Sequence, residues 1–292
     1  MIRLLHLSDL HFGALDPQAA ATLPAYLLEV ARDAAAIVVS GDLTQRARPW
    51  QFLEARRYLD TLSEQLGCPW LAVPGNHDVP LWALWERLAC PLRRYRRLVG
   101  PTGFAWQAPG VRVLGVSTAR RFVPVLRGFW KDGRLDARQL APLRNWPPTG
   151  AEPRTLRVVV AHHPLAAPDD DRRGDGVALG ASAAIPLLAS ANVHLVLGGH
   201  LHVPYVRRLA DTADGVGLWS VQAGTATSWR ARPARDASAG RARRCAFNVI
   251  DVTPAGELTV EVHGRQLPPA GGERTAWGLA ERRILGVFCD PG

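Results

Sequence analysis

The chain has 292 residues, of which 47% are hydrophobic, enough for the interior of one large globular domain. Its net charge of +9 comes from 35 basic and 26 acidic residues, and Lys131 is the sole lysine. This charge favours anionic ligands without choosing among nucleotides, phospholipid head groups and nucleic acid, and an arginine-rich genome would also explain it.

Targeting and redox signals point to a cytoplasmic protein. No apolar stretch approaches the roughly 18 to 20 residues that span a bilayer, so no transmembrane segment is expected, and the first residues are predicted to form a strand rather than a signal peptide. Cys68, Cys90, Cys245 and Cys289 lack the spacing of a zinc knuckle or a disulfide framework.

The first part of the chain alternates predicted strands and helices. Apolar runs at 2–7, 34–39 and 69–73 are predicted to be strands, and helical periodicity is found at 23–31 and 50–66. This order predicts parallel βαβ units.

Later elements are less regular. Residues 81–98 are predicted to form a helix with its tryptophans and leucines facing inward and four arginines facing solvent. Beyond it we expect a helix at 183–190 and strands at 111–116, 156–161, 194–197, 205–209, 217–222, 245–252 and 258–262, the last four antiparallel. We find no interdomain linker, so residues 1–292 are expected to form one domain, with its motifs in 1–230 and further strands and a tail in 231–292.

Polar residues able to bind metals follow five of the predicted strands. They are Asp9 and His11, Asp42, Asn76 and His77, His162 and His163, and His200 and His202. The carboxyl ends of strands in an open α/β sheet line a common crevice, so these side chains are expected to converge. Imidazole nitrogens and carboxylate oxygens bind Zn, Mn, Fe or Co, and one aspartate can bridge two ions. The sequence therefore predicts a pair of divalent metals.

Local spacing supports this prediction. In Asp9-x-His11 and His200-x-His202, both side chains would point to one face if the segments are extended. Glycines directly precede several ligands, where a Cβ would block a close approach, although ordinary turns are the other interpretation. These glycines are Gly41, Gly75, Gly198 and Gly199.

The motifs together resemble the full series of the calcineurin-like metallophosphoesterase family. In order they are Asp9-x-His11, Gly41-Asp42, Gly75-Asn76-His77-Asp78, His162-His163-Pro164 and Gly199-His200-x-His202. Each alone occurs often by chance, but five in order, each after a predicted strand, are specific. We expect an α/β fold, a four-layer α-β-β-α sandwich of two mixed sheets, the first built largely by the N-terminal half and the second by the later strands.

The resemblance also implies roles for these residues. One metal would take Asp9, His11 and His202, the other Asn76, His162 and His200, and Asp42 would bridge them. A water between the two cations would attack phosphorus. His77 would protonate the leaving alkoxide or hold the phosphoryl group.

Asn76, His77 and His163 are expected to contact the substrate. Either His162 or His163 could coordinate metal, and the family pattern favours His162. Asp78 is expected to fix its loop or to orient His77 through a hydrogen bond.

Within the family, the sequence segments around Asp42, His162 and His200 look most similar to those of bacterial class III cyclic nucleotide phosphodiesterases. This implies a small phosphate-ester substrate, in particular a phosphodiester such as a 3′,5′-cyclic nucleotide. The six arginines of 230–244 could reach an anionic substrate or could be solvated. His6, His194 and His263 lack a partner motif and are expected to be packed or solvent-touching histidines.

Alternatives stay open. A DNA repair exonuclease of the same superfamily would suit the basic charge, but no separate DNA-binding module follows, so nucleic acid is not favoured. A lipid-precursor pyrophosphatase would need an amphipathic cap, which Trp82 and Trp85 could supply. A non-catalytic binding scaffold is disfavoured because every expected ligand is present. The oligomeric state is open, and residues 277–288 could pack on a second copy as a homodimer.

Overall fold

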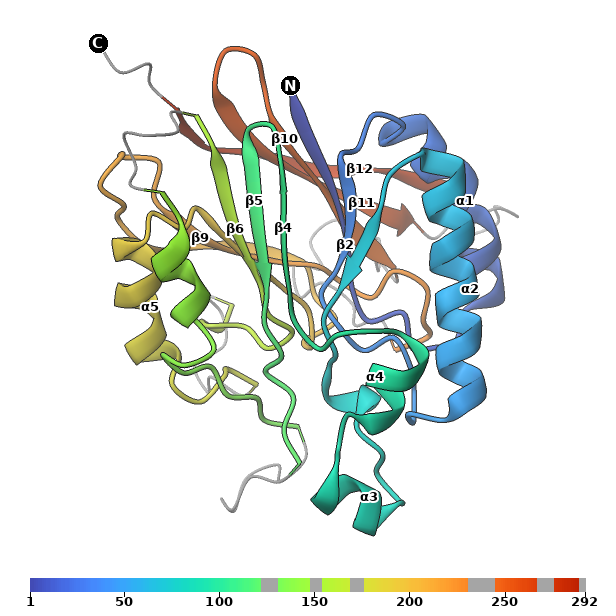
Figure 1. Cartoon of the computed structure of the whole chain (residues 1–292). Coiled ribbons are helices and arrows are strands. Elements are labelled where there is room, and N and C mark those ends of the chain that lie inside the picture. Colours follow the sequence, from blue (N-terminus) through green and yellow to red (C-terminus); the bar gives the residue numbers. More distant parts are fainter. Residues whose placement is uncertain (122–130, 148–153, 169–175, 231–244, 267–275, 289–292) are drawn as a thin grey trace.

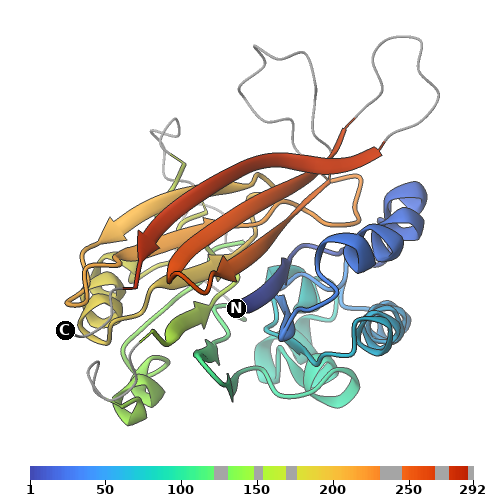
Figure 2. The same ribbon diagram turned by 90° about the horizontal axis from the view of Figure 1, so that it is seen from above.

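The computed structural model describes residues 1–121, 131–147, 154–168, 176–230, 245–266 and 276–288. Two six-stranded mixed sheets pack face to face, with α1 and α2 on one outside face and α5 on the other (Figures 1 and 2). The predicted four-layer α-β-β-α sandwich is confirmed.

The first sheet joins both ends of the chain. Its strand order is β12-β11-β10-β1-β2-β3. The bounds are β1 Ile2–Leu7, β2 Ala36–Val39, β3 Trp70–Ala72, β10 Ala246–Val252, β11 Glu257–Gln266 and β12 Ala276–Val287. The expectation that the N-terminal half builds this sheet was wrong, because β10 returns to pair antiparallel with β1. All of β10 is buried, and a strand covered on both faces belongs in the middle of a sheet.

The second sheet is built from the middle of the chain, in the order β4-β5-β6-β7-β9-β8. The bounds are β4 Phe104–Ala108, β5 Val111–Gly115, β6 Leu156–Val160, β7 Leu195–Gly198, β8 Tyr205–Ala210 and β9 Leu218–Gln222. Strands β4 and β12 were not predicted. Both lie at sheet edges and are only partly buried, so their apolar pattern is weak.

Three apolar clusters separate the four layers, and strand alternation assigns residues to them. Leu5 packs with α1 and α2, whereas its neighbour Leu4 lies between the two sheets. Val158 shares that central cluster, while Val159 faces α5. The two sheets therefore pack directly against each other, and the loops at their ends extend from this core.

Helix α1 (Pro17–Val30) begins earlier than the predicted start at residue 23. Asp16 caps it, since its Oδ1 accepts hydrogen bonds from the backbone N–H groups of the first turn, and Pro17 suits the first helical position. Pro24 inside the helix lacks the N–H that would bond the Ala20 carbonyl. The Tyr58 hydroxyl of α2 donates to that carbonyl instead, at 3.1 Å.

Asp16 also joins α1 to the C-terminal strands. Its Oδ2 accepts a hydrogen bond of 2.8 Å from Arg265 of β11, and both side chains are buried. We expect Arg265→Met to lower the free energy of unfolding by about 3–5 kcal/mol, because it leaves a buried carboxylate without its cation. Urea denaturation measures this loss. Adding Asp16→Asn, which keeps the cap and removes the charge, should restore much of it; a loss below about 1 kcal/mol in the single variant would contradict the prediction.

The remaining helices are α2 (Pro49–Leu66), α3 (Leu84–Ala89), α4 (Arg93–Leu98), α5 (Ala181–Ser190) and the short 3₁₀ turns η1 (Asn76–Asp78) and η2 (Ala141–Asn145). The predicted single helix at 81–98 was wrong. It divides into α3 and α4 around Pro91, which cannot continue a helix. Its tryptophans were also misplaced, since Trp82 and Trp85 face solvent. In the described part of the chain, no helix is long and apolar enough to cross a membrane.

Candidate metal centre

The predicted polar residues lie together at one end of the sandwich. Parallel strands β1, β2 and β3 of the first sheet and β6 and β7 of the second all end there, at the lower side of Figure 1. The loops after these strands carry the predicted ligands, and η1 carries Asn76 and His77.

Asp9, His11, Asp42 and His202 form a first group, whose ligand atoms lie within 4.8 Å of one another. His202 Nε2 is 3.0 Å from Asp9 Oδ1 and 3.1 Å from His11 Nε2. His11 Nε2 is 3.7 Å from Asp42 Oδ2. Such a set of buried oxygens and nitrogens could hold one divalent cation.

A second group surrounds the side chain of Asn76. Its Oδ1 is 3.1 Å from His162 Nε2 and 2.9 Å from His200 Nδ1. Asp42 Oδ2 is 3.4 Å from His162 Nε2, so this one oxygen borders both groups. The arrangement could hold two cations with a shared carboxylate between them.

Several of these residues adopt a left-handed backbone. Asp9, His11, Asp42, His200 and His202 have φ between 50° and 68°, so the two pairs are not extended, which was the condition for the predicted alternation. This conformation costs about 1–3 kcal/mol for a residue with a Cβ, and such strain concentrates at functional sites. The strain is held by rigid neighbours, because Asp9 N and His11 N bond the carbonyls of Gly41 and Asp42.

The glycines beside the site are required by close contacts, which decides between the two interpretations of the sequence. A Cβ on Gly75 would lie 2.1 Å from Asp42 Oδ1, and one on Gly199 would lie 1.9 Å from Ser8 Oγ. A Cβ on Gly41, which has φ of 112°, would lie 2.6 Å from His162 Nδ1. These positions admit no larger residue without moving a site residue or its neighbour.

Backbone carbonyls orient two of the histidine rings. His162 Nδ1 donates to the Ser40 carbonyl and His202 Nδ1 donates to the Arg230 carbonyl, each at 2.9 Å. Both contacts fix the ring so that Nε2 is directed into the site, as in many metal centres. Sequence reasoning missed these partners, because a carbonyl contributes through its position and carries no residue signature.

His163 also has a ring nitrogen within 4.8 Å of those of His162 and His200, but both of its ring nitrogens are engaged by protein atoms. Its Nε2 donates to the Lys131 carbonyl and the Thr118 hydroxyl donates to its Nδ1, both at 2.7 Å. The ring is buried. Contact with metal or substrate would therefore require one of these hydrogen bonds to be exchanged, which favours His162 as the ligand of the pair.

His77 sits at the edge of the first group, with its ring 4.9 Å from that of His11. Its backbone N–H donates to Asp42 Oδ1 and its Nδ1 donates to the Gln45 carbonyl. Of the two roles expected for Asp78, a hydrogen bond to the His77 ring is not found among the described residues. The Asp78 carboxylate instead accepts hydrogen bonds from the N–H groups of Leu43, Thr44 and Gly75, which fixes the loop.

The site is strongly charged without a cation. Burial opposes charge on Asp9 and Asp42, but neighbouring histidines outweigh it and lower the pKa of both carboxyls. Burial lowers the pKa of His11 to about 4, whereas Asp42 overcomes burial and raises the pKa of His162 to about 9. Asp9 Oδ1 and Asp42 Oδ2 are buried and accept no hydrogen bond from the described residues. Orphaned carboxylate oxygens of this kind fit bound cations.

His6, His194 and His263 are buried outside both groups, as expected for packing histidines. His6 bonds Ser40 and Asn248, and burial lowers its pKa to about 3.

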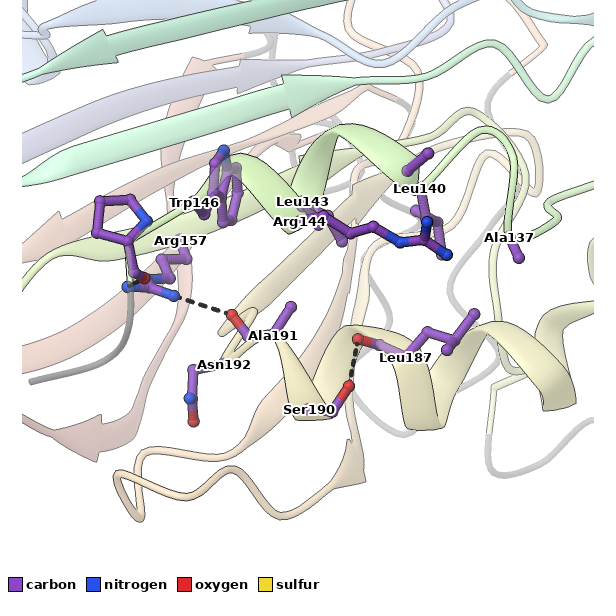
Figure 3. Close-up of a pocket in the computed structure, with 12 residues that line it drawn as sticks. Ala137, Leu140, Leu143, Arg144, Trp146, Arg157, Leu187, Ser190, Ala191 and Asn192 are labelled. Carbon is purple, nitrogen blue, oxygen red and sulfur yellow. Dashed lines mark hydrogen bonds between the residues drawn. The ribbon is translucent and has the colours of Figure 1, made fainter.

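A separate cavity of about 360 Å³ lies between η2 and α5 (Figure 3). Leu140, Leu143 and Leu187 line it, together with Trp146 and Arg144. Its described lining contains none of the predicted site residues.

Comparison with known proteins shows the family and the fold of the chain. A family model described as calcineurin-like phosphoesterase matches residues 2–204. A cAMP/cGMP dual specificity phosphodiesterase of Mycobacterium tuberculosis is 27% identical over 318 residues, covering 99% of this chain and 88% of the relative.

Two solved structures share the fold. A dimetal phosphatase from Danio rerio has a TM-score of 0.62 at 14% identity and covers 98% of this chain and 99% of its own. Purple acid phosphatase PPD1 from yellow lupin has a TM-score of 0.63 at 12% identity and covers 98% of this chain and 53% of its own.

Proposed function

Because the chain belongs to the calcineurin-like phosphoesterase family, we propose that it hydrolyses phosphodiesters with two divalent cations and that a 3′,5′-cyclic nucleotide is its substrate. The substrate rests on the M. tuberculosis relative, whose name describes cAMP and cGMP as its substrates. One observation carries the metal part, namely the two buried carboxylate oxygens of Asp9 and Asp42, which face histidine nitrogens and accept no hydrogen bond from the described residues.

The proposed ligands of the two cations correspond to the two groups of residues described above. Asp9, His11 and His202 would hold one cation, Asn76, His162 and His200 the other, and Asp42 would contact both. The cations would be Mn, Fe, Zn or Co, since these accept mixed nitrogen and oxygen ligands. When bound, they would lower the pKa of a water and stabilise charge on the phosphoryl oxygens.

Residues of the chain itself would supply the proton transfer and the contacts with substrate. Asp42 orients His77 through the backbone hydrogen bond of 2.7 Å, and the Gln45 carbonyl keeps the proton on His77 Nδ1. His77 Nε2 is then the atom that would hold or pass a proton to the leaving oxygen. Asn76 and His163 are the remaining proposed contacts with substrate, and His163 would exchange its hydrogen bond with Lys131 or Thr118 to make its contact.

The first test compares substrates. We expect metal-stripped protein supplied with Mn to hydrolyse cyclic AMP, cyclic GMP and bis(p-nitrophenyl) phosphate, and to lose this activity with a chelator. Single-stranded DNA and a nucleoside diphosphate lipid serve as comparison substrates. Preference for either of these would replace the cyclic nucleotide proposal, and no metal-dependent hydrolysis by folded protein would favour the scaffold alternative.

Metal binding should also stabilise the fold. A cation at 100 times its Kd adds about 2.7 kcal/mol per site, because only the folded chain assembles the ligands. We therefore expect Mn to raise the Tm of metal-stripped protein by about 5 °C or more in a calorimetric scan. Chelation should reverse the shift, and no shift with Mn, Zn, Co or Fe would contradict the ligand assignment.

We further propose that residues 1–292 act as one catalytic domain, supported by the pairing of β10 with β1. A cytoplasmic location is supported by Cys68 and Cys90, which form no disulfide within the described part of the chain. Cys289, the fourth cysteine, lies outside the described residues.

A further inference from the structure

The segment from Trp82 to Leu88 exposes an apolar face that the proposed reaction does not use. Trp82 is 77% exposed and Trp85 is 88% exposed. Leu84 and Leu88 are also exposed. Within α3, Leu84, Trp85 and Leu88 fall on one side of the helix, because residues at these spacings share a face. We call these four residues the α3 face.

The exposure does not come from a loosely attached segment. The carboxylate of Glu86 binds the Arg94 guanidinium of α4 with contacts of 2.6 to 3.0 Å, and Arg94 also donates to the Ala47 carbonyl. On the opposite side, the buried Arg87 donates to the Pro80 carbonyl at 3.1 Å. These polar contacts hold α3 in place with the α3 face outward, and neighbouring exposed apolar side chains of this kind mark interaction sites.

The surroundings of the α3 face are basic. Residues 80–99 contain five arginines and one acidic residue, Glu86, which gives this stretch a charge of +4 (5 − 1). Arg93, Arg96 and Arg97 are exposed on α4. Arg121 donates to the Leu88 carbonyl at the end of α3 and adds a further cation there. Tryptophan next to arginine is the composition of surfaces that bind at the interface of anionic membranes.

We propose that the α3 face docks on an anionic lipid surface, with Trp82 and Trp85 entering the head-group region and the α4 arginines contacting lipid phosphates. The chain would lie on the membrane rather than span it, since α3 has six residues and a span needs about 20. Trp82 and Trp85 both bring a large apolar area with few rotatable bonds, which lowers the entropic cost of insertion.

Charge favours an anionic bilayer, rather than a second copy of the chain, as the partner of the α3 face. Two copies meeting through the α3 face would bring two sets of α4 arginines together, and each chain carries a net charge of +9. An anionic bilayer attracts the same arginines, by about fivefold in affinity for each one near the surface.

Docking would place the metal centre near the membrane. Residue 82 follows Asn76 and His77 by a few positions, and α3 projects from the end of the molecule at which the ligand-bearing strands finish (Figure 1). The first turn of α2, where Trp50 is 45% exposed, begins at this same end (Figure 1). The apolar and basic groups therefore lie beside the site rather than across the molecule.

The test is vesicle co-sedimentation with the full chain. We expect binding to phosphatidylcholine vesicles that contain phosphatidylglycerol, weakened by salt, and little binding to phosphatidylcholine alone. Trp82→Ala with Trp85→Ala should reduce the partition coefficient by about tenfold or more, because two exposed aromatic side chains are removed. Replacing Arg93, Arg96 and Arg97 by glutamine should remove the preference for the anionic vesicles.

The matched control is Leu279→Ala with Ile284→Ala, two apolar residues exposed on β12, which should bind vesicles as the unmodified chain does. Vesicles with brominated acyl chains should also quench the tryptophan fluorescence of the unmodified chain, which tests the idea without a variant. Equal binding by the tryptophan variant, or a dimer in ultracentrifugation that this variant dissociates without vesicle binding, would overturn the proposal. Hydrolysis of a soluble diester should not change in the tryptophan variant.

Discussion

Replacing Asp42 by asparagine is expected to lower metal-dependent hydrolysis of bis(p-nitrophenyl) phosphate by about 1000-fold or more. Asp42 Oδ2 is the oxygen that borders both groups of ligands, 3.4 Å from His162 Nε2 and 3.7 Å from His11 Nε2. Asparagine keeps an oxygen for the His77 N–H and nearly the same volume, but it places an NH₂ where the shared oxygen was. The variant should therefore fold while losing the shared ligand and its negative charge.

Rate and metal content are measured on the same sample. We expect metal analysis of Asp42→Asn to show fewer than two bound cations. We expect kcat to fall while the circular dichroism spectrum stays close to that of the unmodified chain. Asp211→Asn is the control, because the Asp211 side chain is 85% exposed and pairs with Arg208 at the surface. If Asp42→Asn bound two cations and kept a tenth of the activity, Asp42 would not be the bridge.

Replacing His77 by alanine is expected to slow hydrolysis by about 100-fold to 10,000-fold when the leaving group is a poor one, such as a ribose hydroxyl. The Gln45 carbonyl holds Nδ1, so Nε2 is the nitrogen that can serve the leaving oxygen. With p-nitrophenolate, which leaves without a proton, the loss should be much smaller. The measurement is kcat over a series of diesters whose leaving groups differ in pKa. The slope of log kcat against the pKa of the leaving group should be steeper for His77→Ala than for the unmodified chain.

The leaving-group series separates proton transfer from positioning. If His77 only holds the phosphoryl group, every substrate should slow by the same factor and the slope should not change. His263→Ala is the control, since this histidine is buried against Phe247 and bonds Tyr26. We expect it to lower the Tm and to leave the slope unchanged.

Sequence alone identified the candidate ligands that the structure brings together, because each follows a strand that can be recognised locally. Ile2–Leu7, Ala36–Val39 and Leu156–Val160 are largely buried apolar runs, and each ends next to Asp or His. Because parallel strands present their carboxyl ends at one side, the order of strand and polar residue was enough to predict convergence. The family and the four-layer sandwich followed from the same motifs.

Tertiary structure decided the features that depend on distant partners. The place of β10 beside β1 comes from sheet pairing across most of the chain, which no local pattern encodes. The left-handed backbone at Asp9 and His11 is imposed by bonds to the loop after β2, so an argument from strand alternation failed there. The carbonyls that orient His162 and His202 act through position alone. Trp82 and Trp85 face solvent because arginines hold α3 from its other sides, and the helical pattern of leucine and tryptophan carries no information about which side is covered.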